Sequence, residues 1–385
     1  MKEIQNIIAA YDKALSEGKR TALATVVHLE GSSYRRPGAR MLITEDGQLT
    51  GAISGGCLEG DALQKSQMVI AQQKSRIVTY DTTDETDDTL GVGLGCNGII
   101  NILIEPLQPG NPNNQVEFLK KVVSKRQRAV LVTLFDLDSQ RGTQPGTCLL
   151  LNESDEVFST SADPKLDDTL KEDARLVMQD KKSAFKKYIS EGISLTAFIE
   201  YIKPAISLVV IGAGNDVMPL IDMADILGWE TRVFDGRSSY ARPERFAKAC
   251  QVIVSKPEAV LNQIEIDEQT VFALMTHNYK YDYAMLKALI TKNVVYVGVL
   301  GPRKKLERMI EELNNEGIQL SGEQLSTIHG PAGLDIAAET AEEIALSIIA
   351  EIKAILNGKE GRPLKAKPGS IHGRGETIIE ERKLY

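Results

Sequence analysis

From Ile206 to Leu356, short apolar runs alternate with helical segments, and this rhythm constrains the possible folds more than any other feature of the sequence. Strands of a parallel sheet read this way, because the intervening helices cover both faces of the sheet. We expect strands at Leu208–Ile211, Thr231–Phe234, Val252–Val254, Val271–Met275 and Val294–Leu300, with helices at Tyr281–Thr291, Leu306–Asn314 and Thr340–Leu356. The sequence therefore predicts a doubly wound α/β domain over residues 204–357.

The turn after the first of these strands, Gly212-Ala213-Gly214, has the form of a dinucleotide-binding turn in a Rossmann-like domain. A helix that begins there would offer backbone N–H groups to a pyrophosphate, and Asp235 stands where an acid meets a ribose hydroxyl. Val217 replaces the third glycine of the G-x-G-x-x-G pattern. The two glycines either bind a dinucleotide or serve only the tight strand-to-helix turn, since a fold alone does not establish a function.

Two further polar residues follow strands of the same domain, at the sheet edge where ligands of such folds bind. His277 is either a base or ligand-binding group, or a side chain that hydrogen-bonds a loop carbonyl. Arg303 either binds phosphate at the start of the next helix or belongs to a solvated first turn. The sequence leaves both choices open.

The first half of the chain mixes helices and strands without this rhythm, which predicts an α+β domain over residues 1–203 with a sub-boundary at 106–114. Residues 358–385, rich in Gly and Pro, are expected to be a C-terminal tail, either mobile or packed on a partner subunit. Expected helices are Ile4–Leu15, Leu58–Gln73, Val116–Lys125 and Asp167–Gln179, and expected strands are Thr21–His28, Met41–Ile43, Leu49–Ile53, Arg76–Tyr80, Ile99–Glu105, Ala129–Phe135, Thr147–Leu151 and Ala197–Ile202.

Two cysteines of the first half lie in glycine-rich turns, which a ligand can approach closely. Cys57 follows Gly55 and Gly56 and precedes a predicted helix, whose positive end would lower the pKa of its thiol. Cys96 lies in the turn Gly93–Gly98. A thiolate at such a turn would bind a soft metal or attack an electrophile, whereas the bland alternative is a cysteine that merely fits a crowded turn.

A basic loop adds three guanidinium groups, from Arg35, Arg36 and Arg40. These arginines either hold phosphate in bidentate fashion or form surface ion pairs. Glu59 is expected either to pair with one of them or to accept a proton. Thiols together with arginines suggest a site for an anionic ligand that binds sulfur donors.

The bulk composition excludes several other classes of protein. The formal net charge of −8 disfavours nucleic acid as a partner, and no apolar run is long enough to span a membrane. The beginning of the sequence lacks the apolar core of a signal peptide, so we expect a cytosolic protein with four reduced cysteines. Cys148 and Cys250 have apolar neighbours, which predicts that both belong to the core.

Several short motifs follow one another in a fixed order: Gly31–Met41 with Arg-Arg-Pro-Gly-Ala-Arg, Ser54–Gly60, Gly93–Gly98, Gly212–Gly214, Thr276–Asp282, Gly298–Arg303 and His329–Ile336. This ordered set resembles the XdhC/CoxI family, the accessory proteins of xanthine dehydrogenase and related molybdenum hydroxylases. The resemblance covers nearly the whole chain and is weakest in the middle third. Asn215 departs from the pattern, because many members have histidine there.

The resemblance implies a cytoplasmic chaperone that has no turnover of its own and binds the molybdenum cofactor, or molybdopterin, as cargo. Such a protein protects the cofactor while a cysteine desulfurase supplies a sulfido ligand, and then inserts it into apo-xanthine dehydrogenase or a related hydroxylase. The resemblance also implies a homodimer. Cys57 is the matching motif cysteine and the candidate molybdenum contact, with Cys96 as the second candidate.

Two other functions remain open from the residues alone. One is an NAD(P)-dependent oxidoreductase that uses Gly212, Gly214 and Asp235 for the dinucleotide and His277 for proton transfer. The other is a scaffold that links the sulfur donor to the target enzyme without holding cofactor. A complete molybdenum hydroxylase is excluded, since four cysteines cannot supply its iron–sulfur clusters.

Overall fold

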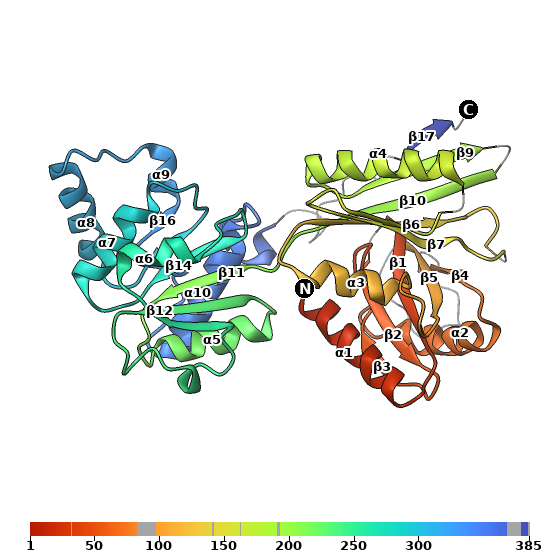
Figure 1. Ribbon diagram of the computed structural model, residues 1–385, viewed down its shortest axis with the longest axis horizontal. Helices are drawn as coiled ribbons and strands as arrows, with labels where there is room; N and C mark the ends of the chain where they lie inside the picture. The colour runs from red at the N-terminus through yellow and green to blue at the C-terminus, as the bar shows by residue number, and fades with distance from the viewer. Residues whose placement is uncertain are drawn as a thin grey trace. The chain divides into compact units, whose positions relative to one another are not determined.

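The computed structural model describes residues 1–31, 33–82, 98–140, 142–161, 163–190, 193–367 and 379–383. The chain forms two compact units (Figure 1). The first extends to Pro204 and includes the C-terminal strand Ile379–Lys383, and the second begins at Ala205. Within the described ranges, no helix is both long and apolar enough to cross a membrane.

The first sheet of the first unit is antiparallel, with the strand order β3-β2-β1-β5-β4. The hairpin between β2 and β3 turns at Gly47, whose φ of +87° suits glycine. Helix α2 packs on one face through Ala62, Val69 and Ile70. The elements are α1 (Lys2–Ser16), β1 (Thr21–Gly31), β2 (Arg40–Thr44), β3 (Leu49–Gly51), α2 (Glu59–Gln72), β4 (Arg76–Asp81) and β5 (Gly98–Leu107).

A second sheet of the same unit has the order β17-β9-β10-β6-β7-β8. Helix α4 packs on one face through residues such as Leu170 and Val177, and the other face meets the first sheet through Phe135 and Phe198. Tyr11 and Phe118, from α1 and α3, belong to a further buried cluster of this unit. The elements are α3 (Gln115–Ser124), β6 (Ala129–Phe135), β7 (Gly146–Asn152), β8 (Val157–Ser159), α4 (Pro164–Asp180), β9 (Ala184–Ser190), β10 (Ile193–Ile202) and β17 (Ile379–Lys383).

The C-terminal segment differs from the expected tail. Strand β17 pairs in parallel with β9 of its own chain. Arg382 contributes to this docking, because its guanidinium lies 3.1 Å from the fully buried carboxylate of Asp173. The composition of residues 358–385 concealed this strand, since its sequence is dominated by charged residues rather than by an apolar alternation.

The second unit contains a wholly parallel sheet in the order β13-β12-β11-β14-β15-β16. Helices α5 and α10 cover one face, and α7 and α8 cover the other (Figure 1). This confirms the predicted doubly wound α/β domain. Its elements are β11 (Ser207–Ile211), α5 (Val217–Ile226), β12 (Glu230–Asp235), β13 (Gln251–Val254), α6 (Pro257–Val260), β14 (Thr270–Leu274), α7 (Tyr279–Leu289), β15 (Val297–Val299), α8 (Arg303–Asn315), α9 (Gly322–Ser326), β16 (Ile328–His329) and α10 (Ala341–Ile355).

The prediction for the two core cysteines is half right. Cys148 is buried, whereas Cys250 is exposed. Cys250 precedes β13, which is the edge strand of its sheet and is only partly covered. An apolar run at a sheet edge therefore misled the prediction.

Candidate functional site

The strand-to-helix turn of the second unit depends on Gly212. This residue has a φ of +124°, and a Cβ atom there would lie 2.3 Å from the carbonyl oxygen of Met275. Only glycine fits such a position. The predicted tight turn is therefore a requirement of the fold, whatever the unit binds.

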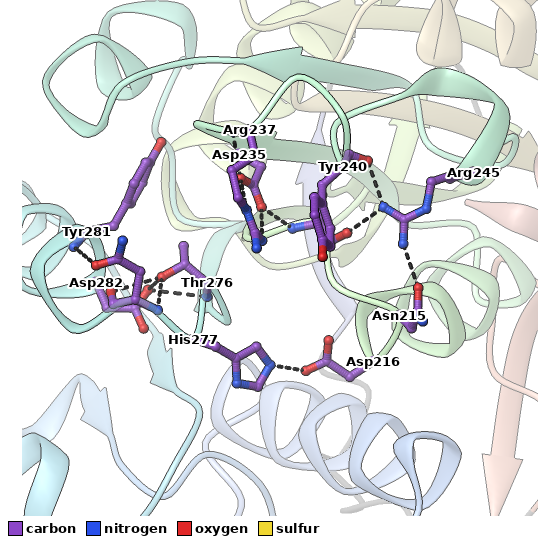
Figure 2. Close-up of polar contacts among 12 residues, drawn as sticks. Asn215, Asp216, Asp235, Arg237, Tyr240, Arg245, Thr276, His277, Tyr281 and Asp282 are labelled. Atoms are coloured by element: carbon purple, nitrogen blue, oxygen red, sulfur yellow. Dashed lines mark hydrogen bonds and ion pairs between the residues drawn. The ribbon is translucent and has the colours of Figure 1, made fainter.

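Asp235 lies at the end of β12, as expected, but its carboxylate is already used inside the protein (Figure 2). It accepts hydrogen bonds from the N–H of Ala213 at 2.9 Å and from Nη2 of Arg237 at 2.8 Å. Burial raises the pKa of the Asp235 carboxyl, but the hydrogen bonds from Arg237 and Ala213 outweigh burial and hold the pKa below its usual value. Both oxygens have protein partners, which disfavours this carboxylate as a ribose acceptor.

The N-terminus of α5 carries a negative charge of its own. Asp216 immediately precedes the helix, and its carboxylate lies 2.8 Å from Nε2 of His277. The N–H of Val217 donates to the carbonyl of Gly214 at 3.3 Å. A pyrophosphate at this helix end would meet a carboxylate and a first N–H that is already paired, so the geometry disfavours dinucleotide binding.

His277 and Asp216 form a dyad across the neighbouring strands β11 and β14, where the order of the sheet reverses (Figure 2). His277 has a φ of +54°, which is uncommon for a non-glycine residue, and its side chain is 64% exposed. The carboxylate orients the imidazole and leaves the second ring nitrogen for a ligand. The dyad is thus suited to acid–base chemistry or to hydrogen bonding.

Neighbouring loops hold this edge of the sheet in place. Asp282 is fully buried, accepts from the hydroxyl of Thr276 at 2.6 Å and pairs with Nζ of Lys305 at 2.6 Å. Arg303, the first residue of α8, is exposed, as either of its two expected roles requires.

The sequence analysis missed Asp216, Arg237 and Arg245. Arg245 bridges the glycine turn, because its guanidinium donates to the carbonyl of Ala213 and to Oδ1 of Asn215, both at 2.7 Å (Figure 2). Only Asp216 had a sequence signal, since an acid at the start of a helix opposes a bound phosphate. The two arginines act through contacts that depend on the fold.

In the first unit, a network of hydrogen bonds fixes the turn that contains Cys57. The hydroxyl oxygen of Ser54 accepts from the N–H groups of Gly56 and Leu58, both at 3.1 Å, and the hydroxyl donates to Glu59. Glu59 also accepts from the N–H of Ser54 at 2.8 Å. The turn therefore has a defined shape, and Cys57 is exposed on it.

The Glu59 carboxylate braces this turn and has no arginine among its described hydrogen-bond partners. Burial raises the pKa of the Glu59 carboxyl, but hydrogen bonds from Ser54 and from the backbone of Ile53 outweigh burial and hold the pKa below its usual 4.5. Glu59 thus stays ionised near neutral pH. It positions the turn and is poorly suited to accept a proton.

The three arginines of the basic loop have different environments. Arg40 is buried, pairs with Glu200 and donates from Nη1 to the carbonyl of Gly38 at 2.9 Å. Arg35 pairs with Glu3 of α1, while its Nε atom is buried without a partner among the described residues. Arg36 is exposed. An external anion can therefore reach Arg36 most readily, and Arg40 has a structural partner.

Tyr34, from the same loop, lies against the cysteine turn. A Cβ atom at Gly55 would lie 3.4 Å from Cγ of the Tyr34 ring. Cys96 and its turn lie outside the described residues, apart from Gly98. The described part of the chain contains no cluster of three or more His, Cys, Asp and Glu residues that could hold a metal ion. A metal-containing ligand at Cys57 would therefore have to bring other donors with it.

Comparison with known families places both units. The model of the XdhC and CoxI family matches residues 14–81. The model described as the XdhC Rossmann domain matches residues 208–352.

Relatives of similar length extend these matches. A Bacillus subtilis protein, named as a probable xanthine dehydrogenase component, is 30% identical over 348 residues, which cover 90% of this chain and 96% of the relative. The Escherichia coli molybdenum cofactor insertion chaperone PaoD is 22% identical over 347 residues, covering 89% of this chain and 86% of PaoD. A Bacillus halodurans protein, whose crystal structure is described as a xanthine dehydrogenase, matches with a TM-score of 0.71 and 28% identity, over 94% of this chain and 98% of that one.

Proposed function

Because the chain belongs to the XdhC and CoxI family, we propose that it is a molybdenum cofactor chaperone that holds the cofactor at the Cys57 turn and inserts it into a molybdenum hydroxylase. The name of the relative PaoD supports this cargo. The target is xanthine dehydrogenase or a related hydroxylase, and a cysteine desulfurase supplies sulfur to the bound cofactor. The chaperone works as a cytoplasmic homodimer.

The observation that carries the proposal is the exposed thiol of Cys57 on a turn that Ser54 and Glu59 hold in place. A thiol is a soft donor suited to molybdenum, and a fixed turn presents it without an ordering cost on binding. No described heavy atom lies within 4 Å of a Cβ at Gly56, so the turn is open on that side. These features fit a bulky ligand that approaches the sulfur.

Charged groups near the turn complement the anionic part of the cofactor. Arg36 is exposed on the basic loop and suits a phosphate. The buried Nε of Arg35 is an unused donor on the same loop. Glu3 pairs with Arg35 and accepts from the N–H of Arg40 at 3.4 Å, so the loop is anchored to α1 at two points. We assign phosphate contact to Arg36 and positioning of the loop to Arg35 and Arg40.

A delivery assay tests the function itself. Protein purified without oxygen from a cofactor-producing host is mixed with a cofactor-free apo-hydroxylase, and hydroxylase activity is measured against the amount of chaperone added. We expect activity to rise in proportion to the chaperone until about one cofactor per hydroxylase site is delivered, because a carrier has no turnover. Activity that never exceeds that of apo-enzyme mixed with cofactor-free chaperone would reject insertion.

The competing oxidoreductase makes a different prediction for the second unit. Asp235 is paired with Arg237, and Asp216 lies at the helix end that would receive a pyrophosphate. We therefore expect NADH and NADPH, titrated to about millimolar concentration, to give no saturable fluorescence change. Saturation in the micromolar range, lost in an Arg237→Ala variant, would instead favour a dinucleotide enzyme.

A further inference from the structure

We propose that the ring of Tyr34 is the stacking surface for the pterin ring system of the cargo, which makes this residue the specificity element of the Cys57 site. The inference rests on the proposed function, since it assigns a binding partner to the flat part of the same cofactor. Tyr34 is the residue that joins the basic loop to the cysteine turn.

The exposure of Tyr34 is the first observation. Its side chain is 67% exposed, although aromatic rings of this size usually bury most of their surface. Its hydroxyl has no hydrogen bond to any described residue. A core role and a hydrogen-bonding role both leave this side chain unexplained, whereas a ligand that covers the ring would explain it.

The fixed position of the ring is the second observation. A Cβ built at Gly55 would lie 3.4, 3.6 and 3.7 Å from Cγ, Cδ1 and Cδ2 of Tyr34, so part of the ring lies against the backbone of the turn. The next residue, Arg35, is anchored to Glu3. The ring is therefore held beside the turn before any ligand binds, which lowers the entropic cost of stacking.

The surrounding chemistry matches a pterin. Flat nitrogen heterocycles stack on tyrosine faces, and such contacts tolerate different edges because they use the π-face. The exposed thiol of Cys57 lies two residues after Gly55, and exposed Arg36 lies two residues after Tyr34. A ligand that combines a flat ring, a sulfur-binding metal and a phosphate finds all three kinds of partner on two adjoining segments.

The test uses full-length protein from a host that cannot make the cofactor, with pterin-6-carboxylate as the fluorescent probe. We expect wild-type protein to quench the probe on binding, Tyr34→Ala to bind it about tenfold more weakly with little quenching, and Tyr34→Phe to behave as wild type. Tyr240→Ala is the matched control, because Tyr240 is another exposed tyrosine, 41% exposed, in the other unit. Thermal melting checks that each variant folds.

The outcomes separate this inference from the proposed function. Equal probe binding by wild type and Tyr34→Ala would overturn the stacking role, and so would a Tyr34→Phe variant as weak as Tyr34→Ala, since the hydroxyl would then be the contact. If Tyr34→Ala retains cofactor from a producing host but no longer binds the apo-hydroxylase, Tyr34 is a protein contact and the stacking role is wrong. If wild-type protein carries no cofactor from a producing host and binds no probe, the proposed function fails as well.

Discussion

Replacing Cys57 with alanine should lower the molybdenum and pterin that co-purify with the protein by at least about tenfold, which corresponds to about 1.4 kcal/mol of binding free energy. The reason is the loss of the exposed soft donor on the turn, while Ser54 and Glu59 still hold the backbone. Metal analysis and fluorescence of the oxidised pterin measure the two contents independently.

The chain offers a matched control for this variant. Cys250 is also an exposed free cysteine, but it belongs to the second unit, so Cys250→Ala should retain full cofactor content. Arg36→Ala should reduce retention of the cofactor through its phosphate. If Cys57→Ala and Arg36→Ala both retain the wild-type content, the proposed site is wrong.

Replacing Glu200 with alanine should destabilise the first unit by about 3–5 kcal/mol, because it leaves the charge of Arg40 buried and unpaired. The Arg40 side chain is 4% exposed and that of Glu200 is 15% exposed, so water cannot substitute for the lost carboxylate. Urea unfolding followed by circular dichroism measures the change.

Two further variants define the cause of this destabilisation. A double variant, Arg40→Met with Glu200→Leu, should recover much of the lost stability, because it removes both charges together. Glu45→Ala, which breaks the exposed pair with Arg20, should shift the midpoint far less. If Glu200→Ala shifts the midpoint no more than Glu45→Ala, the buried pair is not a major determinant of stability.

The elements with strong local signals were predicted well from the sequence. The short apolar runs of the second unit gave its parallel strands, although β15 covers only Val297–Val299 of the expected Val294–Leu300. The hairpin around Asp46-Gly47 formed where its turn residues indicated. These features depend on neighbouring residues, which a sequence displays directly.

Features that depend on distant residues were not predictable in the same way. Strands β9 and β17 are rich in charge, and they form because the fold supplies an edge and a buried carboxylate. The pairing of Arg40 with Glu200 joins residues 160 positions apart. The dyad of His277 and Asp216 joins residues 61 apart, and no local pattern specifies either partner.

The candidate site shows the same division. The glycine turns around Cys57 and Gly212 were visible in the sequence, and both exist in the structure. The sequence could not show that Asp235 and Arg40 have partners inside the protein. Side-chain availability depends on packing, so three of the most prominent polar groups, Glu59 included, turned out to serve the fold.

Cofactor content tests the central claim most directly. The full-length protein is purified without oxygen from a host that makes the molybdenum cofactor, and molybdenum and oxidised pterin are measured per chain. We expect close to one of each per chain, and neither in protein from a host that lacks cofactor synthesis. Absence of both from the cofactor-producing host would contradict a carrier at the Cys57 turn and would direct attention to the His277–Asp216 edge of the second unit.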